Sequence, residues 1–474
     1  MSLSSTMEIG TNGLRVFQAV NEVTSENIAN VNTPGYSRQN AVLETAPSTT
    51  SNGFTLGTGV KIAAIDRVYD GLLQQQLVTA STTQGYDTAK SQVLQQIEPA
   101  FNETNQDGLG AAISKFFGSW QDLTSNPGGY FERQAVLSQS QTLADNFHSV
   151  SQTLNNSIAT QDAALVPLTS SINASLKNIA QINQQILTTQ AVSGNANEMR
   201  DQRDQMIRDL SPKIGIKFTE NQDGTTDIYV QNGAIKDYLV QGVKYGNLTT
   251  EGTSPATSVY INGVSGAPVP VDPKTASPLY TAPDGGQLWA TLQLRDTIIP
   301  NYLTQVDTLA KSITDKVNAV HMSGFSPTGT TGQKFFSTTS SAAGFSVDPT
   351  LTVDKIAASG NVALPSDNSN ALAIVSLSSA QTMPPPPGTP STTFNGFYNS
   401  FVSTVGLDVQ SSKTTVAQDA AFSQQLSTLR ESNSGVSLDE ELTNLVKYQR
   451  SYQASAKLIT TVTDMMDVTI GLIR

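Results

Sequence analysis

The C-terminal stretch SGVSLDEELTNLVKYQRSYQASAKLITTVTDMMDVTIGLIR (434–474) decides the fold. Mostly apolar residues recur there at alternating spacings of four and three for about five heptads, the pattern of a helix with one apolar seam. Ser437 and Glu440 predict a capping box at the helix start, with acids at the positive end of the helix dipole. The seam positions are Leu438, Leu442, Leu445, Gln449, Tyr452, Ala456, Ile459, Thr463, Met466, Ile470 and Ile473.

The N-terminus carries a weaker form of the same pattern, which stops at Pro34 and Gly35. Its seam positions are Ile9, Gly13, Val16, Val20, Val23, Asn27 and Asn30. A long helix cannot leave an apolar face in water, so the two terminal helices most simply pack on each other. Two interpretations stay open: an ordinary helical hairpin inside one domain, or a coiled coil that also packs against other subunits. The polar seam residues favour the second, because such residues specify register and partner at some expense in stability.

The sequence pattern changes four times along the middle of the chain. The spacing predicts helices over 62–130 with breaks, including one from Ala111 to Leu123, then a long helix over about 131–190 and a shorter one ending near Asp209. After Pro212 apolar and polar residues alternate, and Asn-Gln-Asp-Gly (221–224) predicts a hairpin turn. Helical spacing returns from about 287 and again over 397–434, whereas 322–395 is poor in helix signals and holds MPPPPGTP (383–390), a predicted polyproline II spacer or loop.

These segments predict a mainly α fold with a β insertion, arranged as discontinuous nested domains. The ranges are 1–60 and 430–474 for a terminal helical, coiled-coil domain; 61–211, 286–340 and 395–429 for a long-helix bundle; 212–285 for an inserted β domain; and 341–394 for a loop-rich segment or small insertion.

Composition narrows the function. The formal net charge of −12 argues against a binder of nucleic-acid backbone, which needs a basic face. The chain has no cysteine and two histidines, which excludes a disulfide framework or a thiol nucleophile and argues against a structural zinc site. It shows no membrane-spanning run and no secretory leader, and we expect no cofactor, no metal and no membrane partner.

Candidate catalytic groups are weak. Asp201 and Asp204 could share a helix face, but Arg200 and Arg203 lie between and beside them, so ion pairs within the helix explain the cluster better. His321 has no partner residues of a triad or metal set nearby in the sequence, and no common catalytic motif is present. The sequence therefore predicts a protein that is not an enzyme.

Four segments carry a resemblance. SENIANVNTPGYSRQ (25–39) resembles the N-terminal signature of flagellar rod, hook and hook-associated proteins, and its GYSRQ ending is closest to the hook-associated protein 1 (FlgK) family. NEMRDQRDQMIRDLSPKIGI (197–216), GGQLWATLQLRDTIIPNYLTQVDTLAKSITDKVNAVHMSGF (285–325) and the C-terminal helix resemble segments of the same family, in the same order.

The resemblance implies a structural subunit that self-assembles at the distal end of the hook and forms the hook–filament junction. It implies four partners: copies of itself, the hook protein, a second junction protein on the filament side, and an export chaperone of the FlgN type on the C-terminal helix. It also implies a secreted protein of the bacterial flagellum, exported by the flagellar type III system without a cleaved signal peptide.

The expected assembly interface lies on the two seams. We expect the first ~35 and last ~40 residues to be mobile in the free subunit and helical in the assembly. The candidates are Val16, Val20, Val23, Asn27, Asn30, Leu442, Leu445, Tyr452, Ile459 and Met466.

Two alternatives remain. The β insertion could act as a surface adhesin or binding module through exposed aromatic side chains, for which Tyr229, Tyr238, Tyr245 and Tyr260 are available. The chain could also be a hook or distal-rod structural protein.

Overall fold

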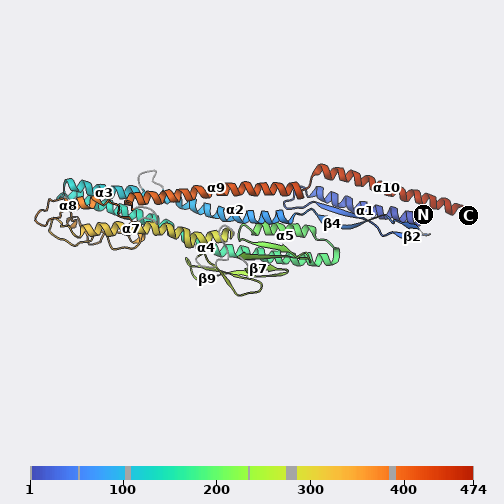
Figure 1. Ribbon diagram of the computed structural model, residues 1–474, viewed down its shortest axis with the longest axis horizontal. Helices are drawn as coiled ribbons and strands as arrows, with labels where there is room; N and C mark the ends of the chain where they lie inside the picture. Colours follow the sequence, from blue (N-terminus) through green and yellow to red (C-terminus); the bar gives the residue numbers. More distant parts are fainter. Residues whose placement is uncertain are drawn as a thin grey trace.

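The computed structural model shows an elongated, mainly helical molecule with both chain ends at one tip and the β sheets along one side (Figure 1). It describes residues 3–51, 54–101, 108–232, 235–273, 285–383 and 391–472. The predicted fold class, mainly α with a β insertion, is confirmed.

The chain ends form an antiparallel helix pair. α1 (Leu3–Ala29) approaches α10 (Leu438–Gly471) with Gly10 beside Ile459 and with Asn27 bonded to Glu441. After α1 the chain forms β1 (Gln39–Thr45), β2 (Thr49–Ser51), β3 (Phe54–Leu56) and β4 (Val60–Arg67), in which β1 pairs with β4 and β2 with β3, both antiparallel. The expected helix over 62–67 is wrong: the i, i+3 spacing of Ile62 and Ile65 suits a helix, but pairing with β1 overrides that local preference.

Long helices build the body of the molecule. They are α2 (Gly71–Ile97), α3 (Leu109–Ser125), α4 (Tyr130–Ser193) and α5 (Asn197–Leu210), with a 3₁₀ turn η1 (Glu98–Phe101) after α2. The predicted helices over 111–123, 131–190 and up to Asp209 are thus confirmed. α4 continues through Pro167 for 64 residues, about 96 Å at 1.5 Å per residue, and ends where Gly194 takes a left-handed conformation.

The β insertion consists of two small antiparallel sheets that pack on the second half of α4. The first is β5 (Lys217–Glu220), β6 (Thr226–Asn232), β7 (Ile235–Gln241) and β8 (Lys244–Tyr245), and the predicted turn at 221–224 joins β5 to β6. The second is β9 (Asn247–Glu251), β10 (Ser258–Asn262) and β11 (Val269–Val271). Leu165, Ile172 and Ile179 of α4 share one apolar core with both sheets.

After the β insertion the rest of the chain leads back to the terminal helices (Figure 1). It forms α6 (Gly286–Gln293), a π-helical turn η2 (Leu294–Ile298), α7 (Ile299–His321), the 3₁₀ turns η3 (Ala342–Gly344) and η4 (Val353–Lys355), α8 (Ser369–Ser376) and α9 (Phe394–Ser434). Most of the described residues within 322–393 are irregular, as expected, but α8 was not predicted. This segment also supplies fully buried core residues: Phe335 packs on Trp120, Phe336 on Phe116, and Phe345 on Phe336. The proline run 383–390 lies, apart from Met383, outside the described residues.

His321 ties this irregular segment to α7. Its ring is fully buried; Nδ1 lies 2.7 Å from the carbonyl oxygen of Gln333, and Nε2 accepts the backbone N–H of Ala357 at 2.9 Å. The ring is therefore neutral with its proton on Nδ1. Burial lowers the pKa of His321 to about 4.

Acid should therefore destabilise the end of the molecule that lies opposite the chain termini, here called the distal end (Figure 1). The unfolded chain takes up the His321 proton near pH 6.5 and the folded chain only near pH 4, so the stabilisation is present above pH 6.5 and falls by up to about 3 kcal/mol as pH drops to 4. Amide exchange of Phe335, Phe336 and Ala357 at several pH values measures it. Unchanged protection factors between pH 7 and pH 4.5 would contradict this role of His321.

Candidate assembly site

The seam of α1 is buried against α10. Gly10, Gly13, Val16, Val20, Val23, Thr24 and Asn27 are the buried residues of α1. The two glycines allow close approach, since a Cβ on Gly10 would lie 2.8 Å from Ile459 and one on Gly13 would lie 2.8 Å from the Ser455 hydroxyl. The predicted packing of the two ends on each other is confirmed by these contacts.

α10 is covered on one side only. Of its 34 residues, only Glu441 and Val462 are buried. Leu445, Ile459 and Met466 are half-buried and lie multiples of seven residues apart, on one face. Leu442 and Tyr452 of the predicted seam are instead 50% and 37% exposed. The apolar surface of α10 is thus broader than one partner helix can cover.

Most of the exposed apolar residues of α10 fall in two patches. The first, here called the outer stripe, is Leu438, Leu442 and Val446, which are 45–50% exposed and spaced by four so that they share a face. The second lies nearer the C-terminus, where Met465, Val468 and Ile470 are 52–65% exposed. Exposed apolar patches of this kind mark interaction surfaces.

Asn27 joins three segments at the base of the helix pair. Its Nδ2 donates to the Gln39 carbonyl oxygen at 2.9 Å and to Glu441 at 3.1 Å, and its Oδ1 accepts from the Gln39 N–H and the Tyr36 hydroxyl, both at 2.9 Å. All hydrogen-bonding positions of the amide are used. Asn30 lies just beyond the end of α1 and is only half-buried. Its amide donates to the Glu26 carbonyl oxygen.

The acids at the start of α10 bind Arg38 rather than forming a capping box. Ser437 is the N-cap residue, as predicted, but its side chain makes no capping hydrogen bond. Glu440 and Glu441 each lie 2.8 Å from the Arg38 guanidinium. The predicted capping box is wrong because the folded chain offers the acids a cation on the segment that follows α1.

The charged residues of α5 connect different elements, not neighbouring turns of the helix. Arg67 of β4 binds Asp201 at 2.9 Å and Asp204 at 2.7 Å, while Arg203 binds Glu220 of β5 at 3.0 Å. These side chains are 1–7% exposed except Glu220. The expected ion pairing within the helix is found between Arg203 and Asp204, whose nearest atoms lie 3.6 Å apart. The shorter ion pairs of these buried residues instead connect α5 to β4 and β5.

The ion-paired side chains of β4 and α5, here called the joint, connect the terminal segments to the body. Burial and neighbouring charges act against each other on their pKa values. Burial raises the pKa of Asp201 despite the neighbouring Arg67. Burial opposes the charge of Arg67, but Asp204 and Asp201 outweigh it and raise the pKa of that guanidinium above its ordinary value. A buried pair of this kind fixes orientation, and removing one partner destabilises strongly.

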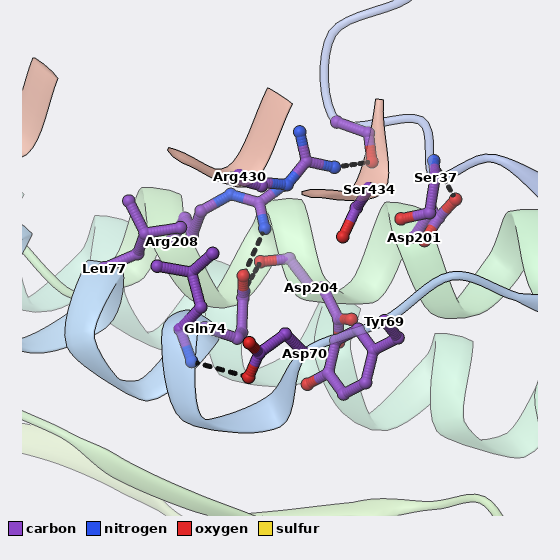
Figure 2. Close-up of a pocket in the computed structure, with 12 residues that line it drawn as sticks. Ser37, Tyr69, Asp70, Gln74, Leu77, Asp201, Asp204, Arg208, Arg430 and Ser434 are labelled. Carbon is purple, nitrogen blue, oxygen red and sulfur yellow. Dashed lines mark hydrogen bonds between the residues drawn. The ribbon is translucent and has the colours of Figure 1, made fainter. Parts of the chain in front are cut away.

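Figure 2 shows the space enclosed at the joint, where Gln74, Arg208 and Arg430 meet the 35–37 turn. Arg208 donates to Gln74 at 2.7 Å, and Arg430 donates to the Gly35 carbonyl oxygen at 2.6 Å. The free volume is only ≈ 10 Å³, about the room of one water and too small for a cofactor.

The part of the chain that the structure describes holds neither a candidate metal site nor a candidate membrane span. Within the described ranges no group of three or more histidine, aspartate or glutamate side chains is placed to hold a metal ion. None of the helices described combines the length and apolar character that crossing a bilayer requires. Trp120 and Trp289 are buried in the two main cores.

Replacing Asn27 with alanine should open the helix pair. The change leaves the Gln39 backbone, the Tyr36 hydroxyl and Glu441 short of partners, and should lower the free energy of opening by about 3 kcal/mol. Amide exchange of Val16 to Val23 measures this. Asn30→Ala is the matched control, with an expected loss below about 1 kcal/mol; equal losses in both variants would contradict the role given to Asn27.

Three families of flagellar proteins match separate parts of this chain. The flagellar hook-associated protein FlgK helical domain matches residues 94–336, just over half of the chain. The flagella basal body rod protein family matches residues 7–36, and the flagellar basal body rod FlgEFG protein C-terminal family matches residues 430–472. The two terminal matches cover the helix pair.

Relatives match over nearly the whole length. Flagellar hook-associated protein 1 of Bacillus subtilis (strain 168) is 25% identical, covering 98% of this chain and 97% of that protein. Flagellar hook-associated protein 1 of Escherichia coli (strain K12) is 26% identical, covering 99% and 100%. The structure of the flagellar hook junction protein FlgK from Burkholderia pseudomallei shares the fold, with a TM-score of 0.63 and 16% identity over 76% of this chain and 100% of that one. The resemblance found in the sequence is confirmed: the chain belongs to the flagellar hook-associated protein FlgK family, a family of structural flagellar proteins.

Proposed function

We propose that this protein is a structural subunit that assembles at the distal end of the flagellar hook and joins the hook to the filament. The observation that carries the proposal is the half-covered helix α10, whose apolar outer stripe has no partner within the described part of the chain. The names of its relatives, hook-associated protein 1 and hook junction protein, support the location.

The outer stripe supplies a driving force for assembly. Leu438, Leu442 and Val446 lie beside the face that packs on α1, so a neighbouring subunit could extend the existing helix pair into a larger coiled coil. Completing the burial of each half-exposed side chain is worth about 1 kcal/mol. Repeated around a ring or helical array, such contacts bind each subunit to several neighbours.

The family resemblance implies the partners and the export route, and the exposed face of α10 offers a surface for such partners. Copies of the chain, the hook protein and a second junction protein on the filament side would cover the terminal helices, and a chaperone of the FlgN type would cover α10 before export. Export by the flagellar type III system without a cleaved signal peptide, a location outside the cell and the absence of enzymatic activity complete the proposal. The nested domain ranges given above stay part of it, supported by two separate large cores, one distal and one under the β sheets.

The adhesin alternative has less support. Tyr229 is buried and packs on Tyr238 with ring centroids 5.6 Å apart, and Tyr260 is half-buried. Tyr245, at 48% exposed, is the one exposed side chain of the four, so they form no aromatic platform. A hook or rod protein is disfavoured by the FlgK match to the helical domain.

A charge on the outer stripe should break the junction. Leu442→Glu leaves the α1 contacts in place, so the variant should fold and be exported, yet strains carrying it should make hooks, shed filament protein into the medium and lose swimming. Thr443→Glu adds the same charge one residue along on another exposed face and should swim normally. Normal filaments on Leu442→Glu cells, with the variant found at the hook, would contradict the proposal.

A further inference from the structure

Helices α2 and α9 pack side by side between the terminal helix pair and the distal core (Figure 1). They run antiparallel, because Ser91 lies 3.3 Å from Ser412 while Leu77 and Ala80 pack on Leu426. The apolar part of this stretch is a small cluster of four residues. Between the serine contact and that cluster, two acids face each other: Asp87 of α2 and Asp419 of α9.

The two carboxyl groups lie close together without a hydrogen-bond donor between them in the part of the chain that the structure describes. Asp87 is 8% exposed, and the two side chains are within hydrogen-bonding reach of each other. The Oδ2 atom of Asp419 is buried, and no donor from the described residues reaches it. Two carboxylates cannot donate to each other, whereas a carboxylic acid on one side chain supplies the missing hydrogen bond.

Few charges nearby could neutralise the pair. On α2, Lys90 acts on Asp87 but does not outweigh the effect of burial, and the Tyr86 hydroxyl bonds to Gln293 of α6. The α6 segment Gly286–Gln293 contains no charged residue. On α9, Lys413 lies 3.6 Å from Glu98 and is engaged there. Burial, and then the charge of Asp419, raises the pKa of Asp87 to about 6; burial also raises the pKa of Asp419.

We propose that Asp87 and Asp419 share one proton across the α2–α9 contact and form a switch that tightens this contact in mildly acid solution and loosens it at neutral pH. The stabilisation is present when the folded pair holds its proton and is lost as pH rises through about 6. Above that pH both groups are charged, and like charges in a partly buried site repel.

The position gives the switch a mechanical consequence. The far ends of α2 and α9 reach the distal core, and their near ends reach the joint with the terminal helices. A looser contact at neutral pH lets the two helices separate along the stretch that links these parts. The proposal rests on the described side chains and is independent of where the subunit sits in the flagellum.

Residue-resolved amide exchange on the full chain tests the switch. Protection factors for Thr82 to Val93 and Ser412 to Leu426, corrected for intrinsic exchange, should be about tenfold higher at about pH 5 than at about pH 7.5. A local readout is needed because His321 makes the distal end less stable in the same acid range. Asp87→Asn and Asp419→Asn should each reduce the pH effect and raise protection at about pH 7.5, because the amide removes the like charge and can donate to the remaining carboxylate.

The matched control is Asp122→Asn, an exposed acid on α3, which should keep the tenfold effect. Equal protection in the wild-type chain at both pH values would overturn the proposal, as would an unchanged pH effect in both asparagine variants at the α2–α9 contact. A rise in protection at pH 7.5 on adding Ca²⁺, reversed by a chelator, would also overturn it, because the pair would then be a cation site.

Discussion

The packing of α10 on α1 is the contact on which the rest of the structure depends. α10 has 34 residues and apolar side chains around much of its circumference, but it meets one helix of 27 residues. One neighbour covers about a third of a helix surface, so a face remains apolar and exposed. The fold thus pairs the two terminal helices while retaining a surface that other molecules can cover.

Polar contacts, not apolar ones, orient this helix pair relative to the body. Asn27 and Arg38 bind α10 and so hold the terminal segments together. Toward the body, Arg67 of β4 binds Asp201 of α5, and Arg430 of α9 donates to the Gly35 carbonyl oxygen. Hydrogen bonds between guanidinium and carboxylate groups are directional, so they fix an angle more sharply than apolar packing does. The joint therefore transmits the position of the terminal helices to the long helices behind it.

Periodicity predicted the elements that are long and regular. The heptad spacing of α10 and α4, the alternation after Pro212 and the family resemblance all proved correct. The strands at 39–67 and the buried role of Phe335 and Phe336 were missed, because pairing and burial there depend on contacts distant in sequence. At the site, the seam of α1 was predicted correctly, but the face of α10 that contacts α1 differs from the predicted seam, since Val462 is buried and Leu442 is not. A broad apolar stripe does not specify which part of it meets the partner helix. The buried ion pairs of α5 could not be predicted, because Arg67 lies over a hundred residues away.

The most direct test uses the absence of natural cysteines in this chain. A cysteine at Leu442, in the outer stripe, should react rapidly with a maleimide in the dilute monomer and become at least about tenfold slower once the subunit is built into flagella, because neighbours cover it. A cysteine at Val462, buried against α1, should react slowly in both states. Equal, rapid labelling of Leu442→Cys in monomer and assembled flagella would show that the outer face of α10 stays open, and would contradict the account.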